Sequence, residues 1–96
     1  MPLKIRWLKQ ALANLDAEAE YISRDNPAAA QRVLTAVMDA VELLARHPAL
    51  GRPGRVEGTR ELVVVGTPYI IPYRVRQDGV EVLRVFHGVR KWPPKF

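Results

Sequence analysis

The sequence predicts a single α+β domain in which a helix hairpin packs on an antiparallel sheet, in the order β-α-α-β-β-β. Three observations support this. The front half changes from alternating to helical periodicity, Pro and Gly concentrate between residues 48 and 60, and three strand-like segments follow. A chain of 96 residues has room for one hydrophobic core, so we expect residues 1–96 to form one domain.

The front half predicts one short strand and two helices. Residues 3–7 alternate apolar and basic side chains, which is typical of a strand with one apolar face. From Leu8 apolar residues recur at steps of four and three, which predicts an amphipathic helix of about 16 residues with Asn14 facing solvent. The Asn26-Pro27 pair suits the N-cap and first turn of a second helix, which runs to about Arg46. Their short connection predicts an antiparallel hairpin.

The back half predicts a loop and then three strands, at residues 60–65, 69–76 and 80–87. The Asp78-Gly79 pair is a strong signal for a two-residue hairpin turn. With that turn, Arg76 would face Glu81 across the ladder. Pro72 cannot donate a ladder hydrogen bond, so it predicts an edge position or a bulge. The first strand must join this sheet, because its apolar face would otherwise be exposed.

The composition excludes several classes of chemistry. The chain has no cysteine, which rules out disulfides, thiolate zinc sites and a cysteine nucleophile, and suits a reducing cytoplasm. The N-terminus lacks the pattern of a signal peptide, and no apolar run approaches the length of a membrane span. His47 and His87 stand alone among scattered acids, so we expect no metal site, and the glycine spacing matches no cofactor loop.

Positive charge is concentrated in the back half. The net charge is +5; residues 1–48 hold six basic and six acidic side chains, whereas residues 49–96 hold nine basic and four acidic ones. A one-sided basic surface attracts nucleic acid, an acidic protein or a phosphate-rich substrate. The alternative is that the charge serves only solubility.

Four segments of the back half carry a family resemblance. They are PALGRPGR at 48–55, GTREL at 58–62, YIIPYRV at 69–75 and VLRVFHGVR at 82–90. With the element order, these segments resemble the ParE/RelE superfamily of toxins from bacterial type II toxin–antitoxin modules. The resemblance implies a RelE/ParE-like fold and a toxin that a cognate antitoxin neutralises.

The superfamily implies two possible activities. RelE-like members are endonucleases that cut mRNA on the ribosome, and ParE-like members inhibit DNA gyrase. RNA cleavage needs groups that remove a proton, stabilise the phosphorane charge and return a proton. For that activity the candidate catalytic residues are His87, which titrates near neutrality, with Arg74 and Arg90.

Two departures from the RelE-like pattern favour gyrase inhibition. Many RelE-like nucleases carry an arginine directly after the aromatic residue that opens the third strand, whereas Ile70 follows Tyr69 here. No tyrosine follows Tyr73, so the C-terminal catalytic tyrosine of some members is missing. The ribosome-dependent endonuclease stays an alternative, and a degenerate module that only binds its antitoxin is a third.

Six residues are candidates for binding a partner or nucleic acid: Arg60, Arg74, Arg84, Arg90, Lys91 and Trp92. Each has a structural alternative: the arginines could pair with Glu57, Glu61 or Glu81, Trp92 could pack on the sheet, and His87 could bond the backbone. The expected partner is a ribbon-helix-helix antitoxin whose acidic, partly disordered tail docks on the basic sheet and in a groove beside the helices.

Overall fold

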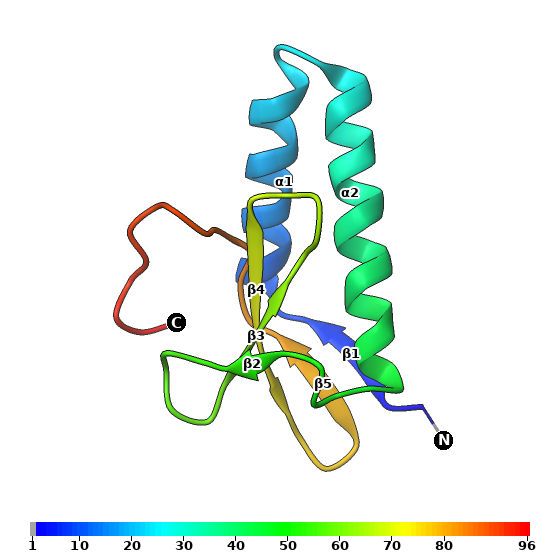
Figure 1. Cartoon of the computed structure of the whole chain (residues 1–96), viewed down its shortest axis with the longest axis vertical. Helices are drawn as coiled ribbons and strands as arrows, with labels where there is room; N and C mark the ends of the chain where they lie inside the picture. Colours follow the sequence, from blue (N-terminus) through cyan, green and yellow to red (C-terminus); the bar gives the residue numbers. More distant parts are fainter. Residues whose placement is uncertain (1) are drawn as a thin grey trace.

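The computed structural model describes residues 2–96. Its elements are β1 (Lys4–Trp7), α1 (Lys9–Ser23), α2 (Pro27–Glu42), a 3-10 turn (Leu43–Ala45), β2 (Arg52–Pro53), β3 (Arg60–Val63), β4 (Tyr69–Val75), β5 (Gly79–Val82) and β6 (Phe86–His87). The two helices stand side by side as the expected hairpin, and the strands form one twisted sheet (Figure 1). The α+β fold predicted from the sequence is therefore confirmed.

Local sequence signals explain the helices. The Asn26 side chain accepts a hydrogen bond from the Ala29 N–H (3.0 Å), and Pro27 occupies the first turn of α2, as predicted. The buried residues of the helices are small or branched apolar side chains, namely Ala11 and Leu15 in α1 and Ala30, Val37 and Val41 in α2. Neither helix is long and apolar enough to cross a membrane within residues 2–96.

The strands are ordered β1-β5-β4-β3-β2, and β6 continues β5 along β4. All neighbours are antiparallel except β1 and β5, which run parallel. We expected a fully antiparallel sheet. Because no tight turn joins β1 to β5, their relative direction follows from the path of the intervening helices and strands rather than from hairpin geometry.

The turn between β4 and β5 differs from the prediction. The connecting residues are Gln77 and Asp78, so Arg76 pairs with Gly79, and Glu81 faces Arg74. Gly79 is a strand residue: a Cβ there would lie 2.9 Å from the Lys4 carbonyl oxygen of β1. A glycine is needed at this position because β1 and β5 approach each other closely there, and not because of the turn.

A β-bulge interrupts the strand that returns along β4. Residues 83–85 lie opposite only two residues of β4, one of which is Pro72. The Pro72 carbonyl accepts a hydrogen bond from the Leu83 N–H (2.9 Å). Of the two possibilities that this proline predicts, an edge position or a bulge, the structure shows the bulge. The Val85 N–H donates to the Asn14 side chain of α1 (3.2 Å). The expectation that Asn14 faces solvent was wrong, because the bulge turns a backbone donor toward the helix.

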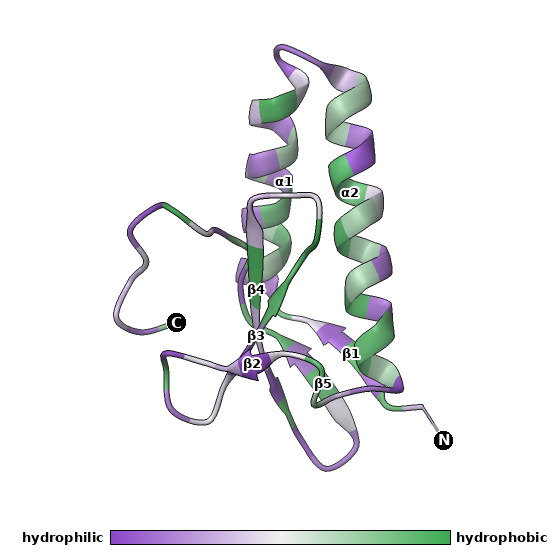
Figure 2. Ribbon diagram, viewed as in Figure 1, coloured by the Kyte–Doolittle hydropathy of each residue, from purple (hydrophilic) through white to green (hydrophobic). Residues whose placement is uncertain are grey.

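The hydrophobic core lies between the helix hairpin and one face of the sheet. Its most buried side chains are Ala11, Val37, Val41, Leu44, Ile71, Tyr73, Val80 and Val82. Figure 2 shows hydrophobic segments on the facing sides of helices and strands, with hydrophilic segments outside. Since side chains alternate along a strand, the residues between these core positions lie on the sheet's outer face, away from the helices.

Candidate functional site

The outer face of the sheet carries a buried carboxylate held by three arginines. Glu81 of β5 lies between Arg6 of β1 and Arg74 of β4 in the strand register. Arg6 pairs with one carboxylate oxygen, while Arg74 and Arg76 donate through Nε to Oε1 at 2.6 and 3.3 Å. Three guanidinium groups on one carboxylate leave an excess of two positive charges on this face.

A second buried carboxylate, Glu61 of β3, is held by two arginines. Arg52 donates to Oε1 (3.1 Å), and Arg55 donates to Oε2 through both its backbone N–H (2.9 Å) and its Nε (3.0 Å). Burial alone would raise the pKa of Glu61, but the hydrogen bonds from Arg55 and Arg52 outweigh it and hold the pKa below the usual value. The carboxylate is therefore charged and pins the loop before β3 to the sheet.

The C-terminal segment packs on this outer face. The Trp92 ring is only 9% exposed; it lies under the Arg55 guanidinium, 3.4 Å from Cζ to the ring centroid, and against Phe86. Its Nε1 donates to the His87 carbonyl (3.1 Å). Trp92 is thus an anchor for the tail, and its ring is not the exposed partner contact that we considered. Phe96 also packs on Phe86, with centroids 5.6 Å apart.

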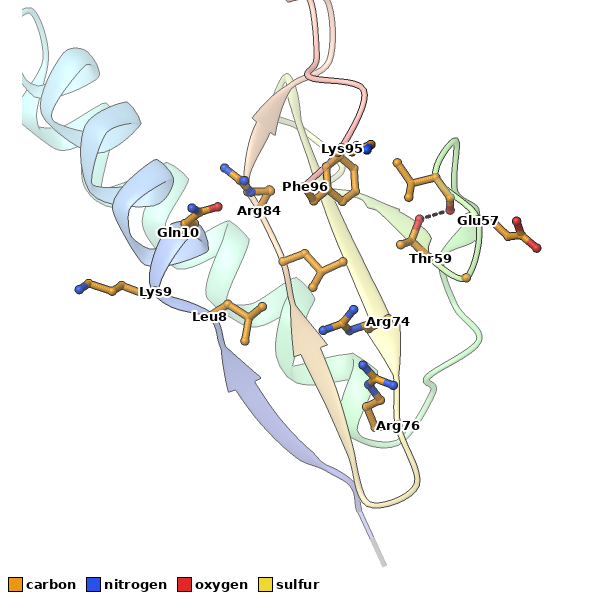
Figure 3. A pocket seen from close by; sticks show the side chains of 13 residues that line it. Leu8, Lys9, Gln10, Glu57, Thr59, Arg74, Arg76, Arg84, Lys95 and Phe96 are labelled. Carbon is orange, nitrogen blue, oxygen red and sulfur yellow. Dashed lines mark hydrogen bonds between the residues drawn. The ribbon is translucent and has the colours of Figure 1, made fainter.

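A basic cleft of about 660 Å³ opens between the start of α1, the end of β4, the bulge that follows β5, the loop at residues 56–59 and the end of the tail (Figure 3). Its basic side chains are Lys9, Arg74, Arg76, Arg84 and Lys95. Leu8, Leu83 and Phe96 supply apolar surface. The single acidic side chain, that of Glu57, points away from the arginines in Figure 3. Of the six predicted binding residues, Arg74 and Arg84 meet in this cleft.

The other predicted arginines have different surroundings. Arg60 donates to the Gly51 carbonyl (2.8 Å), so its charge helps to fix the loop before β2 rather than pairing with a glutamate. It also lines a cavity of about 310 Å³ that adjoins the basic cleft and shares Arg74 with it. Lys91 is exposed.

The candidate catalytic residues are not assembled in one cleft. The His87 ring meets the Tyr69 ring edge-on, with centroids 5.8 Å apart, and its Nδ1 accepts the Val89 N–H (3.4 Å). Arg90 is paired with Glu18 of α1 (2.7 Å). His87 and Arg90 are both absent from the lining of the basic cleft that holds Arg74. The structure therefore does not bring His87 and Arg90 into the cleft that holds Arg74, and their joint catalytic role stays a prediction.

Glu18 ties three elements together and was not singled out by its sequence. Besides Arg90 it binds the Tyr69 hydroxyl of β4, which donates to Oε1 (2.9 Å). Burial, and then the nearby Glu18 carboxylate, raise the pKa of Tyr69 to about 12. Tyr69 is thus a protonated phenol at neutral pH, and its hydroxyl ties β4 to α1. Within residues 2–96 no three His, Cys, Asp or Glu side chains gather as metal ligands would.

Comparison with known families and relatives agrees with this architecture. Residues 5–92 match the model of a family described as "ParE toxin of type II toxin-antitoxin system, parDE". The chain is 51% identical over 90 residues to "Putative toxin Y4kP" of Sinorhizobium fredii, covering 94% of this chain and 93% of that protein. It is 39% identical over 87 residues to "Toxin RelE2" of Caulobacter vibrioides, covering 91% and 97%.

Solved structures show the same fold. A chain of the chromosomal ParDE toxin–antitoxin system from P. aeruginosa superposes with a TM-score of 0.80 at 27% identity, covering 88% of this chain and 95% of that one. A chain of the toxin–antitoxin complex RelBE2 from Mycobacterium tuberculosis has a TM-score of 0.65 at 30% identity, covering 91% and 99%.

Proposed function

Since this chain belongs to the ParE toxin family of type II toxin–antitoxin systems, we propose that it inhibits DNA gyrase and that a cognate antitoxin neutralises it. Membership establishes a toxin of the ParE/RelE superfamily. The choice of gyrase over the ribosome rests on the site itself.

The carrying observation is that the basic cleft has cations but neither a histidine nor a tyrosine for proton transfer. Its ionisable lining consists of arginines, lysines and Glu57, without a histidine or a tyrosine. Cleavage of RNA requires a base and an acid that work near neutral pH, within hydrogen-bond reach of the reacting oxygens. Arginine cannot supply either role, because it stays protonated. The cleft therefore supports binding of an anionic partner and gives no support to nucleolysis.

Supercoiling of relaxed plasmid by purified gyrase tests the proposal. Wild-type toxin should inhibit the reaction in a concentration-dependent manner, and His87→Ala should inhibit equally, because that side chain lies outside the basic cleft. Circular dichroism of both proteins controls for folding. Undisturbed supercoiling at a large excess of folded toxin would refute gyrase inhibition.

A RelE-like endonuclease is the second candidate, favoured by the 39% identity to the relative named RelE2 and by the basic outer face. Primer extension on a translated mRNA after induction of the toxin decides between the two. Codon-positioned cuts that disappear in His87→Ala would establish the endonuclease, whereas an uncut message favours gyrase. Absence of growth arrest on expression alone would instead favour a degenerate antitoxin-binding module.

The proposed antitoxin site is an apolar groove beside α2 and the open edge of β3. The groove has a volume of about 580 Å³ and is lined mainly by Ala36, Ala40, Leu43, Leu50 and residues 62–65. β2 pairs with β3 only at Arg60 and Glu61. The Val64 N–H donates to the Tyr69 carbonyl of β4, so the backbone groups of Val63, the last residue of β3, point to the open edge.

An extended antitoxin segment could therefore add a strand to this edge and place apolar side chains in the groove. The basic outer face would attract an acidic tail, so association should slow with added salt. Val65 lines the groove and is 90% exposed, and Val89 on the C-terminal tail is 88% exposed. The two valines therefore form a matched pair for substitution, one inside the groove and one outside it.

Binding to the antitoxin encoded beside the toxin gene would test this docking. Val65→Asp should weaken association by about tenfold or more, since it puts a charge into the apolar contact, whereas Val89→Asp should leave it nearly unchanged. Equal effects of the two substitutions, or association rates that do not change with salt, would contradict the proposed site.

A further inference from the structure

We infer that the basic cleft is a binding site for the phosphodiester backbone of nucleic acid, so that the toxin touches DNA directly. The inference rests on the proposed function in one respect: the DNA bound by gyrase would be its natural ligand. The cleft itself is defined without reference to gyrase, by Arg74, Arg76, Arg84 and Lys95 around a space of about 660 Å³.

The arginines of the cleft have free binding capacity. Arg74 and Arg76 bond Glu81 only through Nε, so their terminal amino groups have no hydrogen-bond partner within residues 2–96. Arg84 makes no ion pair in the same part of the chain. A guanidinium group held along one side and free at its end is prepared to donate two hydrogen bonds to a phosphate oxygen pair.

Glu81 acts as the positioning residue of this cleft. It is 6% exposed and fixes the two guanidinium groups side by side, with Arg6 holding the carboxylate from the other strand. Fixed side chains lose less conformational entropy on binding an anion than free ones do. Because Glu81 bonds three arginines, it orders them while cancelling only one of their three charges.

The shape of the surface favours a polynucleotide over a single small anion. The adjoining cavity continues from Arg74 to Arg60, so cations follow one another along a track rather than surround one point. Leu8, Leu83 and the Phe96 ring offer apolar surface beside that track, as sugars and bases require. Figure 3 shows Arg84 and Phe96 toward one end of the cleft, with Arg74 and Arg76 toward the other.

Fluorescence anisotropy of a labelled single-stranded DNA, with toxin alone and across a range of salt concentrations, tests the site. If Arg74, Arg76 and Arg84 each neutralise one phosphate, the slope of log K against log salt should be about −2. Arg84→Ala should make this slope shallower by about 0.7 and lower the affinity by about fivefold. Arg32→Ala is the matched control, because Arg32 is exposed on α2 and its substitution removes the same charge at a position outside the cleft.

Four results would overturn the inference: no salt-dependent binding, equal effects of the two substitutions, binding of RNA alone, or a poly-glutamate peptide that competes as well as unlabelled DNA. Similar affinities for DNA and RNA would support it, because both share the backbone. No gyrase is present in this assay. DNA binding without inhibition of supercoiling would therefore refute only the proposed target, and inhibition by a toxin that does not bind DNA would refute only this inference.

Discussion

Tyr73 offers a sharp test of how the loop before β2 is held in place. Its ring is fully buried in the core, and its hydroxyl makes two hydrogen bonds at the core's edge. It donates to the Pro48 carbonyl (2.7 Å) and accepts from the Gly51 N–H (2.8 Å). Tyr73→Phe removes only this oxygen, so the ring packing stays while both loop groups lose their partner.

The size of the effect follows from burial. The Gly51 N–H is buried, and leaving it unpaired costs about 1–3 kcal/mol. The Pro48 carbonyl is only partly buried and adds roughly 0.5–1 kcal/mol. The expected loss in the free energy of unfolding is thus about 1.5–4 kcal/mol. For a domain of this size, that lowers Tm by roughly 6–30 °C.

Urea and thermal unfolding, followed by circular dichroism, measure this loss. Tyr21→Phe is the control, because the Tyr21 side chain is 62% exposed on α1 and removing its hydroxyl should change stability by less than about 0.5 kcal/mol. If Tyr73→Phe is no less stable than Tyr21→Phe, the two hydrogen bonds do not anchor the loop, and the reasoning fails.

Three further predictions follow from buried polar groups. Because the folded pKa of Glu61 is lowered, its contribution to stability should be lost as pH falls below about 4.5, so urea unfolding of Glu61→Gln should depend less on pH there than that of wild type. Tyr69, with a folded pKa of about 12 and an ordinary value of 10.0, should contribute about 2–3 kcal/mol that is present below pH 10 and lost between roughly pH 10 and 12. In the same unfolding assay Tyr69→Phe should remove that decline, and a wild-type curve flat over this range would contradict it. Asn14→Ala should cost about 1–2 kcal/mol and speed hydrogen exchange at the Val85 amide, whereas Asn14→Asp, which keeps an acceptor, should lose less.

The parts of the fold that local chemistry determines could be predicted from the sequence. The cap at Asn26, the helix hairpin and the bulge at Pro72 each depend on neighbouring residues and were found from them. The error in the predicted turn between β4 and β5 changed the predicted contacts only slightly. The true register differs by two residues, which keeps Arg76 on the same face, so it still reaches Glu81.

Contacts between distant segments could not be predicted in this way. Gly79 resembled a turn residue, but it is needed because the Lys4 backbone passes close by. The stacking of Trp92 under Arg55 joins the tail to a loop far away in the sequence. The sequence indicated which arginines are available and on which strands, and only the folded sheet showed that Arg74 and Arg84 share a cleft without His87.

The accumulation of cleaved DNA by gyrase tests the central claim most directly. Gyrase, supercoiled plasmid and toxin are incubated together, treated with detergent and protease, and resolved on a gel. We expect linear plasmid to increase with toxin concentration, because a gyrase-directed toxin of this kind should trap the cleaved complex. No linear plasmid at a large excess of folded toxin, together with codon-positioned cuts in mRNA, would contradict the claim and assign the chain to the ribosome.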